Sequence, residues 1–476
     1  MTADHDTIVA PATAPGGAIA VIRVSGERAL ALCDTLFRGR TPLAEAAGYT
    51  VHYGRIADGD RTVDDVLAAV FRAPHSYTGE DAVEISCHGS SYIVSEILRL
   101  LIAAGARMAS PGEFTVRAYL AGKLDLAQAE AVGDLVAASS QAAHALASNQ
   151  MRGGYSAALA ALRDRLLHLT ALLELELDFA EEEVEFADRR ELRQTMRDIA
   201  REIDRLRDSF ALGNAIKEGV PVAIAGAPNV GKSTLLNRLL GEERAMVSEI
   251  AGTTRDVIEE RANIDGIVFR FLDTAGIRST NDTLEQMGIA RTMSSIERAQ
   301  IIIRLIDASQ PAVPVSGGSP SSGQTGRKSA PAVASADSAA DTPSPNFPLR
   351  PDQTLLTVYN KIDKTPRFAL PEGAVGISAR NGDGIDDLRR ILRDAVDTEA
   401  LYHGGTVISN SRHYEALTSA SEALSAALDG LRDNLPTDLL SEEIRQVIRH
   451  LSGVTGQDIV PEEVLKTIFS KFCIGK

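Results

Sequence analysis

The chain has 476 residues, of which 65 are acidic and 49 basic, giving a formal net charge of −16 at pH 7. That length suffices for about three domains. Because the chain is this acidic, its surface as a whole is not expected to bind nucleic acid. Binding of RNA would need a local basic patch or the surface of a partner protein. The three cysteines, Cys33, Cys87 and Cys473, have no C-x-x-C spacing. They indicate a reducing compartment and exclude a disulfide framework and a cysteine zinc site.

Hydrophobic residues make up 44% of the chain, enough to build sizeable cores. No apolar run reaches about 18 residues, and no basic segment followed by an apolar one opens the sequence. We therefore expect no membrane span and no signal peptide, and we expect a cytoplasmic protein.

Residues 1–121 are predicted to form a compact α/β unit. GAIAVIRVSG, TVDDVLAAVFRAP and EDAVEISCHG are typical of strands, whereas GERALALCDTLF and SSYIVSEILRLLIAAGA are typical of helices. Charged residues gather at the boundaries of these elements. Arg23, Glu84 and Lys123 could converge on a polar ligand, although ordinary surface ion pairing is the simpler explanation.

Residues 122–218 are predicted to be helical. Apolar residues recur there at i, i+3, i+4 and i+7, which is typical of packed helices. The acidic run at 181–185 could bind a metal, but a solvated helix face explains it more simply.

A phosphate-binding loop is predicted at 221–233, PVAIAGAPNVGKS. The apolar run 221–225 predicts a buried strand, and TLLNRLLG, after the loop, has helical spacing. Gly226, Gly231, Lys232 and Ser233 fill the fixed positions of G-x-x-x-x-G-K-[ST]. Such a loop points backbone N–H groups at one spot, where the helix dipole also favours a phosphate. Lys232 would reach the β and γ phosphates, and the Ser233 hydroxyl would ligate Mg²⁺.

The guanine base is predicted to be recognised by Asn360, Lys361 and Asp363 in TVYNKID, after another apolar run. The Asp363 carboxylate could accept hydrogen bonds from the N1–H and 2-amino groups of guanine, which adenine lacks. In VGISAR, Ser378 and Ala379 stand where a backbone N–H could contact the guanine O6. The nucleotide is therefore expected to be GTP.

A further motif, DTAG, supplies Asp273, which could hold Mg²⁺ through water, and Gly276, whose N–H could contact the γ-phosphate. Together the four motifs follow the order of a GTP-binding domain, each at a strand end. They predict an inserted Ras-like α/β G domain at 219–384.

The switch segment SEIAGTTRD contains Thr254, which could give a hydroxyl to Mg²⁺ and an N–H to the γ-phosphate. Ile277 stands where many GTPases have a glutamine that orients water. We prefer Glu285 for that task, although a solvated carboxylate at a helix start is equally possible. No arginine is placed as a finger. The Asn229 side-chain carbonyl could instead ligate a monovalent cation, or simply close the turn.

Residues 311–350 interrupt the G domain, and 26 of these 40 residues are Pro, Ser, Gly or Ala. Too few are bulky and apolar to build a core, so a disordered insertion without effect on catalysis is predicted. The segment 385–476 is helical again and shows no core of its own. We expect it to pack against the helices of 122–216, so that two chain segments form one all-α domain.

The assembled motifs resemble the MnmE (TrmE) family of bacterial tRNA-uridine modification GTPases. The resemblance rests on FCIGK at the end of the chain, IAGTTRD, DTAGIR followed by Glu285, YTGEDAVEISCHG and PGEFTVRAYLAGKLDLAQAEAV, in family order. It spans nearly the whole chain except 311–350. It implies an α/β N-terminal domain (1–121) that resembles tetrahydrofolate-binding enzymes. A helical domain (122–218 and 385–476) and a G domain (219–384) complete the implied organisation.

The resemblance also implies an activity. A carboxymethylaminomethyl-type group would be installed at carbon 5 of the wobble uridine (position 34) of certain tRNAs, from a one-carbon unit of 5,10-methylene-tetrahydrofolate and from glycine or ammonium. 5-Formyl-tetrahydrofolate would bind as an analogue. The protein would be a homodimer and would form a heterotetramer with the FAD-dependent MnmG (GidA) protein. GTP hydrolysis would be stimulated by K⁺ and coupled to dimerisation of the G domains.

The residue roles that the resemblance implies follow its motifs. Folate would contact Arg23, Glu84, Lys123 and Lys476, and K⁺ would lie among Asn229, Ser248, Ile250 and Thr253. Mg²⁺ would be held by Ser233, Thr254 and, through water, Asp273. Further GTP contacts would come from Val230, Gly231, Lys232, Thr234, Gly276, Asn360, Lys361, Asp363, Ser378 and Ala379. The catalytic residues would be Lys232, Thr254, Glu285 and Cys473, the last with a conformational or partner-contact role as an open alternative.

Two departures from the family pattern stand out. The turn ATAPGGAIAVIRVSG lacks a basic residue often found there, and CHG at Cys87 replaces the usual GHG. Two other functions stay open. A ribosome-assembly switch without covalent chemistry would need a basic RNA-binding module, and none is visible. A free-standing folate enzyme with a regulatory G domain would transfer one-carbon units without the partner.

Overall fold

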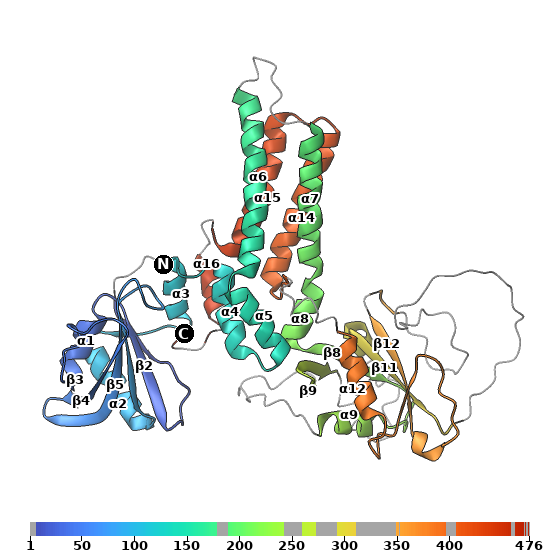
Figure 1. The fold of residues 1–476 in the computed structure, drawn as a ribbon, viewed down its shortest axis with the longest axis horizontal. Coiled ribbons are helices and arrows are strands. Elements are labelled where there is room, and N and C mark those ends of the chain that lie inside the picture. The colour runs from blue at the N-terminus through green and yellow to red at the C-terminus, as the bar shows by residue number, and fades with distance from the viewer. Residues whose placement is uncertain are drawn as a thin grey trace, which may run out of the picture. The chain divides into compact units, whose positions relative to one another are not determined.

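Figure 1 shows the fold in a computed structural model of the chain. The structure describes residues 6–178, 189–241, 259–272, 293–310, 349–351, 353–396, 406–457, 462–470, 472 and 475. The chain divides into two compact units. One contains Met1–Ala137, Ala147–Arg207 and Arg412–Lys476, and the other contains Ala138–Leu146 and Asp208–Ser411.

The first unit begins with a seven-stranded sheet in the order β3-β4-β5-β6-β2-β1-β7. All neighbouring strands are antiparallel except β1 and β7, which are parallel. Its strands are β1 (Ile8–Pro11), β2 (Ile19–Ser25), β3 (Phe37–Gly39), β4 (Thr50–Asp58), β5 (Arg61–Phe71), β6 (Ala82–His88) and β7 (Arg107–Met108). The accompanying helices are α1 (Ala29–Leu36), α2 (Ser91–Ala103) and α3 (Glu113–Leu120).

Residues alternate between the two faces of this sheet. Ile22, Val24, Ile85 and Cys87 point into the core shared with α1 and α2, so the cysteine of CHG packs as a small apolar side chain. Burial raises the pKa of the Cys87 thiol to about 11, with the nearby Asp64 charge adding to the rise. Arg23 lies between Ile22 and Val24 in β2, and Glu84 lies between Val83 and Ile85 in β6. Both side chains are therefore on the opposite face of the sheet.

The same unit contains helices from both ends of the chain. They are α4 (Leu126–Ala137), α5 (Gln141–Met151, shared with the second unit), α6 (Gly154–Asp178), α7 (Arg189–Asp208), α14 (Ser411–Arg432), α15 (Thr437–Thr455) and α16 (Glu462–Phe469). Figure 1 shows α6, α7, α14 and α15 side by side in an elongated bundle. Ser421 of α14 donates to Asp204 of α7 at 2.8 Å and accepts from Arg207 at 3.2 Å. The prediction that two distant segments form one helical domain is confirmed.

A buried charge cluster joins three of these helices. Arg412, in the first turn of α14, donates to Glu130 of α4 at 2.9 Å and to the carbonyls of Gly453 and Val454, near the end of α15. His413 contacts the other oxygen of Glu130 at 2.7 Å. Burial by itself would raise the pKa of Glu130, but His413 and Arg412 hold it below the ordinary value. Such a cluster is stabilising only when every charge keeps its partner.

The second unit is built on a six-stranded sheet in the order β13-β12-β11-β8-β10-β9. Only β9 is antiparallel to its neighbour. The strands are β8 (Val220–Ala225), β9 (Glu260–Ile264), β10 (Ile267–Phe271), β11 (Ile301–Asp307), β12 (Thr354–Asn360) and β13 (Val375–Ile377). The helices are α8 (Phe210–Glu218), α9 (Lys232–Leu240), η2 (Ile362–Lys364) and α12 (Ile385–Asp394). The predicted α/β architecture of the G domain is confirmed.

In a parallel sheet the carboxyl ends of the strands meet at one edge, which is where such folds bind ligands. The loop after β8, the end of β11 and the end of β12 all lie at that edge. The predicted switch and most of the predicted insertion, at 311–348, lie outside the described residues. Among the helices that the structure describes, none has both the length and the apolarity to cross a bilayer.

Candidate functional site

The loop between β8 and α9 has the backbone that its glycines predict. Asn229 and Gly231 have positive φ angles of 60° and 104°. A Cβ on Gly226 would lie 2.4 Å from the Leu305 carbonyl oxygen, and one on Gly231 would lie 2.3 Å from the Asn360 amide nitrogen. Both contacts are too short for any side chain, so glycine is required at both positions for this loop to close.

Lys232 begins α9 and folds back over the loop. Its ammonium donates to the carbonyls of Gly226 at 2.7 Å and Ala227 at 3.0 Å. Burial lowers the pKa of Lys232, because the ammonium is partly removed from water. The positive charge is thus held against the loop that the sequence predicts to bind phosphates. Ser233 follows in the first turn of α9 and is half-buried, whereas Thr234 is exposed.

Asn360 joins three of the predicted motifs. It ends β12, and its side chain is buried, with the residue 3% exposed. The amide nitrogen donates to the Val230 carbonyl in the phosphate loop at 2.8 Å, and the amide oxygen accepts from the Ala379 N–H at 3.0 Å. Every polar atom of a buried amide needs a partner. Asn360 therefore fixes the distance between the phosphate loop and the loop at 378–380.

Lys361 also contacts the phosphate loop, and it pairs with Asp307, a residue that was not predicted from the sequence. Its ammonium donates to the Asn229 carbonyl at 2.8 Å and to the Asp307 carboxylate at 2.7 Å. Burial alone would raise the pKa of Asp307, but hydrogen bonds from Lys361 and Ser309 hold it below its usual range. The available signal was an aspartate at the end of IIIRLID, where parallel strands place side chains at the binding edge.

Asp363 lies in η2, and one of its carboxylate oxygens accepts from the Ser378 hydroxyl at 2.7 Å. Ser378 is fully buried, whereas Asp363 is exposed. The serine thus orients the carboxylate, and the remaining lone pairs can accept from a pair of N–H donors in the plane of a base.

Other predicted nucleotide and metal residues lie outside the described part of the chain. They are Ser248, Ile250, Thr253, Thr254, Asp273, Gly276 and Glu285. Of the predicted metal ligands, the structure describes Ser233 and Asn229. Both offer side-chain oxygen atoms, and oxygen is the ligand atom that hard cations such as Mg²⁺ prefer.

A second cluster lies in the N-terminal sheet. Arg23 of β2 and Glu84 of β6 are directly opposite in the antiparallel register. The Arg23 Nε and one terminal nitrogen contact the same carboxylate oxygen of Glu84 at 2.9 and 2.8 Å. The rings of Tyr77 and Phe114 each lie 5.5 Å from the guanidinium carbon, within range for cation–π attraction. Arg23 is therefore held by a carboxylate and two aromatic rings.

The end of the chain reaches this cluster. Arg23 donates to the Gly475 carbonyl at 3.3 Å. Gly475 is buried with φ of 100°, and a Cβ there would lie 2.1 Å from the Pro11 carbonyl oxygen. The ring of Phe472 packs against Gly133 of α4 and lies 5.3 Å from the ring of Phe469. Residue 475 must be glycine for the tail to lie this close to the sheet.

The remaining residues predicted for this cluster lie elsewhere or are not described. Lys123, in the exposed loop after α3, lies beside Gly79 rather than in the pairing of Arg23 with Glu84. Lys476 and Cys473 fall outside the described residues. Sequence reasoning missed Tyr77 and Phe114, although both stand in segments singled out for their charged residues, HSYTGEDAVEISCHGS and SPGEFTVRAYLAGKLDLAQAE.

Comparison with known proteins identifies the chain. A family model described as the MnmE helical domain matches residues 126–473, and one described as the N-terminus of GTP-binding protein TrmE matches residues 7–123. The chain belongs to the MnmE family. This confirms the resemblance seen in the sequence.

Relatives named tRNA modification GTPase MnmE are similar to the chain over its whole length. The protein of Bacteroides thetaiotaomicron is 45% identical over 489 residues, covering 99% of this chain and 100% of its own. That of Flavobacterium psychrophilum is 46% identical and covers 99% of both chains. That of Cytophaga hutchinsonii is 46% identical and covers 100% of this chain and 99% of its own.

Solved structures give a weaker likeness. The G domain of the Thermotoga maritima FeoB iron transporter covers 37% of this chain and 98% of its own, at 16% identity and a TM-score of 0.22.

Replacing Asn360 with alanine is expected to destabilise the second unit. The change leaves the Val230 carbonyl and the Ala379 N–H without the amide that now pairs them, at about 1–3 kcal/mol for each buried group. Thermal unfolding of the full chain, followed by circular dichroism, measures the effect. Asn381→Ala, an exposed asparagine in the adjacent loop, is the control and should unfold like the wild type. Equal unfolding temperatures for both variants would contradict the role given to Asn360.

Proposed function

We propose that the chain is a tRNA modification GTPase. As a member of the MnmE family it is a GTPase, and its relatives bear the name of the tRNA modification enzyme. The observation that carries the proposal is that one chain holds two separate sites. In the first, Asn360 holds together the loops that would bind a guanine nucleotide. In the second, the ion pair of Arg23 with Glu84 in the N-terminal sheet contacts Gly475 near the end of the chain.

In the nucleotide site, the loop from Gly226 to Gly231 would enclose the phosphates, with Lys232 moving from the loop carbonyls to the β and γ phosphates. Asp363, oriented by Ser378, would accept from the guanine N1–H and 2-amino groups. A contact of the Ala379 N–H with the guanine O6 would have to share or replace its present bond to Asn360. The same binding site would include Val230, Ser233, Thr234, Ser248, Thr253, Thr254, Asp273, Gly276, Asn360 and Lys361.

For hydrolysis we propose Glu285 as the group that orients water, because Ile277 cannot. Ser233, Thr254 and, through water, Asp273 would hold Mg²⁺, which supplies charge neutralisation on the phosphates when bound. Asn229, Ser248, Ile250 and Thr253 would hold K⁺ in the place of an arginine finger, with two G domains meeting across their switches. The hydrogen bond from Lys361 to the Asn229 carbonyl fixes the backbone from which the Asn229 side chain would reach the ion.

In the N-terminal domain we propose that Arg23, Glu84, Lys123 and Lys476 bind 5,10-methylene-tetrahydrofolate, with 5-formyl-tetrahydrofolate as an analogue. The described residues fit such a ligand. An ion pair whose side chains are 22% and 30% exposed can bind the polar edge of a pterin, and the Tyr77 ring, in a residue 37% exposed, can provide an apolar wall. The cofactor supplies the one-carbon unit when bound. Cys473 would act near it, as a nucleophile or through conformational or partner contacts.

The product would be a carboxymethylaminomethyl-type group at carbon 5 of the wobble uridine (position 34) of certain tRNAs. The working assembly would be a homodimer in a heterotetramer with the FAD-dependent MnmG (GidA) protein, whose surface would carry much of the tRNA. Within each chain we propose the domains 1–121, 122–218 with 385–476, and 219–384. A net charge of −16 agrees with tRNA binding shared with a partner.

Replacing K⁺ with Na⁺ at constant ionic strength is expected to slow GTP hydrolysis, because the smaller ion fits the same oxygen donors poorly. The measurement is phosphate release under single-turnover conditions, with Asn229→Ala as a variant that should hydrolyse slowly in both salts. Hydrolysis at equal rates in the two salts would rule out an essential ion beside Asn229.

The function itself is tested by mass spectrometry of nucleosides from tRNA. Cells lacking the protein, and cells carrying only Glu285→Ala, should lose the carboxymethylaminomethyl-type wobble uridines that the wild-type gene restores. Glu297→Ala, an exposed glutamate in the same unit, is the control and should restore them fully. Unchanged nucleosides together with accumulating unassembled ribosomal subunits would replace the proposal with a ribosome-assembly switch.

A further inference from the structure

Two segments form the walls around Arg23. One is the loop 76–80, which places the Tyr77 ring beside the guanidinium, and the other is α3, which places the Phe114 ring there. The Tyr77 hydroxyl shares a hydrogen bond of 2.9 Å with the Thr115 hydroxyl of α3. The position of Tyr77 therefore depends on how the loop is held against α3 and against β2.

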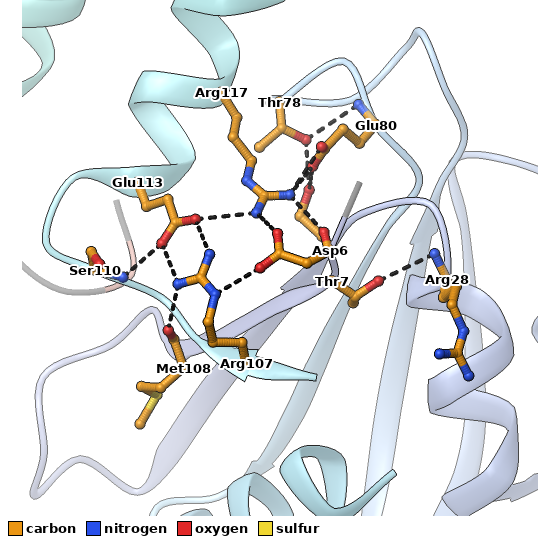
Figure 2. Close-up of polar contacts among 11 residues, drawn as sticks. Asp6, Thr7, Arg28, Thr78, Glu80, Arg107, Met108, Ser110, Glu113 and Arg117 are labelled. Atoms are coloured by element: carbon orange, nitrogen blue, oxygen red, sulfur yellow. Dashed lines mark hydrogen bonds and ion pairs between the residues drawn. The ribbon is translucent and has the colours of Figure 1, made fainter. Parts of the chain in front are cut away.

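Arg117 of α3 makes the main polar connection between these segments. Figure 2 shows its guanidinium at the centre of a cluster, between Glu80 on one side and Asp6 and Glu113 on the other. One terminal nitrogen donates to both oxygens of Glu80, at 3.0 and 3.3 Å, and to the Asp6 carbonyl at 2.9 Å. The other donates to Glu113 at 3.1 Å and to the Asp6 carboxylate. The side chain is only 11% exposed.

Glu80 also forms hydrogen bonds that link Arg117 to β2 and to the loop 76–80. It accepts from the Ser25 hydroxyl at 2.7 Å, and Ser25 shares a second hydrogen bond of 2.7 Å with Thr78. Ser25 stands two residues after Arg23 in the same strand. The carboxylate of Glu80 thus links α3, the loop and the strand that carries Arg23.

Arg107 belongs to the same cluster but does not reach the loop. It contacts Glu113 at 2.6 Å and Asp6 at 2.7 Å, and its side chain is 48% exposed. Its hydrogen bonds within the described residues go to Asp6, Met108 and Glu113. Burial alone would raise the pKa of Glu113, yet Arg107, the Ser110 N–H and Arg117 hold it below the ordinary value. Arg107 therefore shares two acidic partners with Arg117 and lacks the link to Glu80.

We propose that Arg117 is a positioning residue of the folate site: by holding Glu80 it fixes the loop 76–80, and with it the Tyr77 ring, beside Arg23. The inference rests on the proposed function of that site. A guanidinium suits this task because its planar fork spreads five N–H donors over three nitrogens, which reach acidic groups on different sides, whereas the three donors of lysine lie on one atom. Without Arg117, the loop would occupy its binding position in a smaller fraction of molecules. Ligand affinity falls in proportion to that fraction, about tenfold if it drops to about a tenth.

The test compares full-length Arg117→Met with Arg107→Met, the matched control. Hydrogen–deuterium exchange of the ligand-free proteins is followed in the peptide covering 73–82, and calorimetry gives the dissociation constant of 5-formyl-tetrahydrofolate. We expect Arg117→Met to exchange faster in that peptide and to bind about tenfold more weakly, with Arg107→Met close to wild type in both. Arg117→Lys should restore little. Glu80→Gln keeps Arg117 in place, weakens the same link and should reproduce both effects if Arg117→Met fails to fold.

Two outcomes overturn the inference. Exchange in 73–82 that is unchanged in both Arg117→Met and Glu80→Gln shows that the link does not hold the loop. Equal acceleration in Arg107→Met and Arg117→Met shows a structural cluster without a specific role. Because the exchange measurement needs no ligand, it separates these outcomes from failure of the proposed function, which would appear as wild-type protein that does not bind the folate.

Discussion

The candidate nucleotide site depends on one buried amide. The carboxyl ends of β8 and β12 bring the phosphate loop and Asn360 to the same edge of the sheet, but strand pairing alone does not fix how a loop closes above that edge. Asn360 does so by binding the Val230 carbonyl with its nitrogen and the Ala379 N–H with its oxygen. The side chain also fills the space where Gly231 lacks a Cβ. The geometry of the loop, the glycine requirement and the position of the Ala379 N–H therefore depend on the same side chain.

The cluster around Arg23 in the N-terminal sheet also depends on contacts between distant segments, but these contacts involve a charged group and aromatic rings. Strand alternation places Arg23 and Glu84 opposite each other on the face away from the core shared with α1 and α2. A cross-strand ion pair alone contributes little. The rings of Tyr77 and Phe114 and the Gly475 carbonyl enclose the guanidinium and turn the pair into a defined site. All three groups come from segments far from β2 in the sequence.

The comparison of sequence with structure shows where pattern reasoning works. Fixed spacing revealed Lys232, Ser233, Asn360 and Asp363, because backbone geometry at a strand end leaves few alternatives there. Helical periodicity, together with the missing core of 385–476, led correctly to one helical domain built from two segments. The sequence patterns thus predicted the fold class correctly, and they placed the candidate nucleotide residues at the strand ends where the structure has them.

Contacts between distant segments were not predictable in this way. Asp307 contacts Lys361 across neighbouring strands, and Arg117 joins α3, the start of β1 and the loop 76–80. Nothing in the sequence distinguishes Tyr77 and Phe114 from other aromatic residues, and only the fold shows that both rings lie beside Arg23. Such partners depend on tertiary packing and leave no periodic signal.

We propose that a guanine nucleotide held by Asp363 drives the modification of tRNA. The most direct test exchanges the nucleotide specificity, because asparagine offers an N–H donor to the O2 carbonyl of xanthine in place of the acceptor that guanine needs. Modification is reconstituted from tRNA, 5,10-methylene-tetrahydrofolate, glycine, the FAD-dependent partner and either wild type or Asp363→Asn, with GTP or XTP. We expect wild type to modify tRNA with GTP, and Asp363→Asn to modify tRNA with XTP and only poorly with GTP. Equal modification by both proteins with GTP would contradict it.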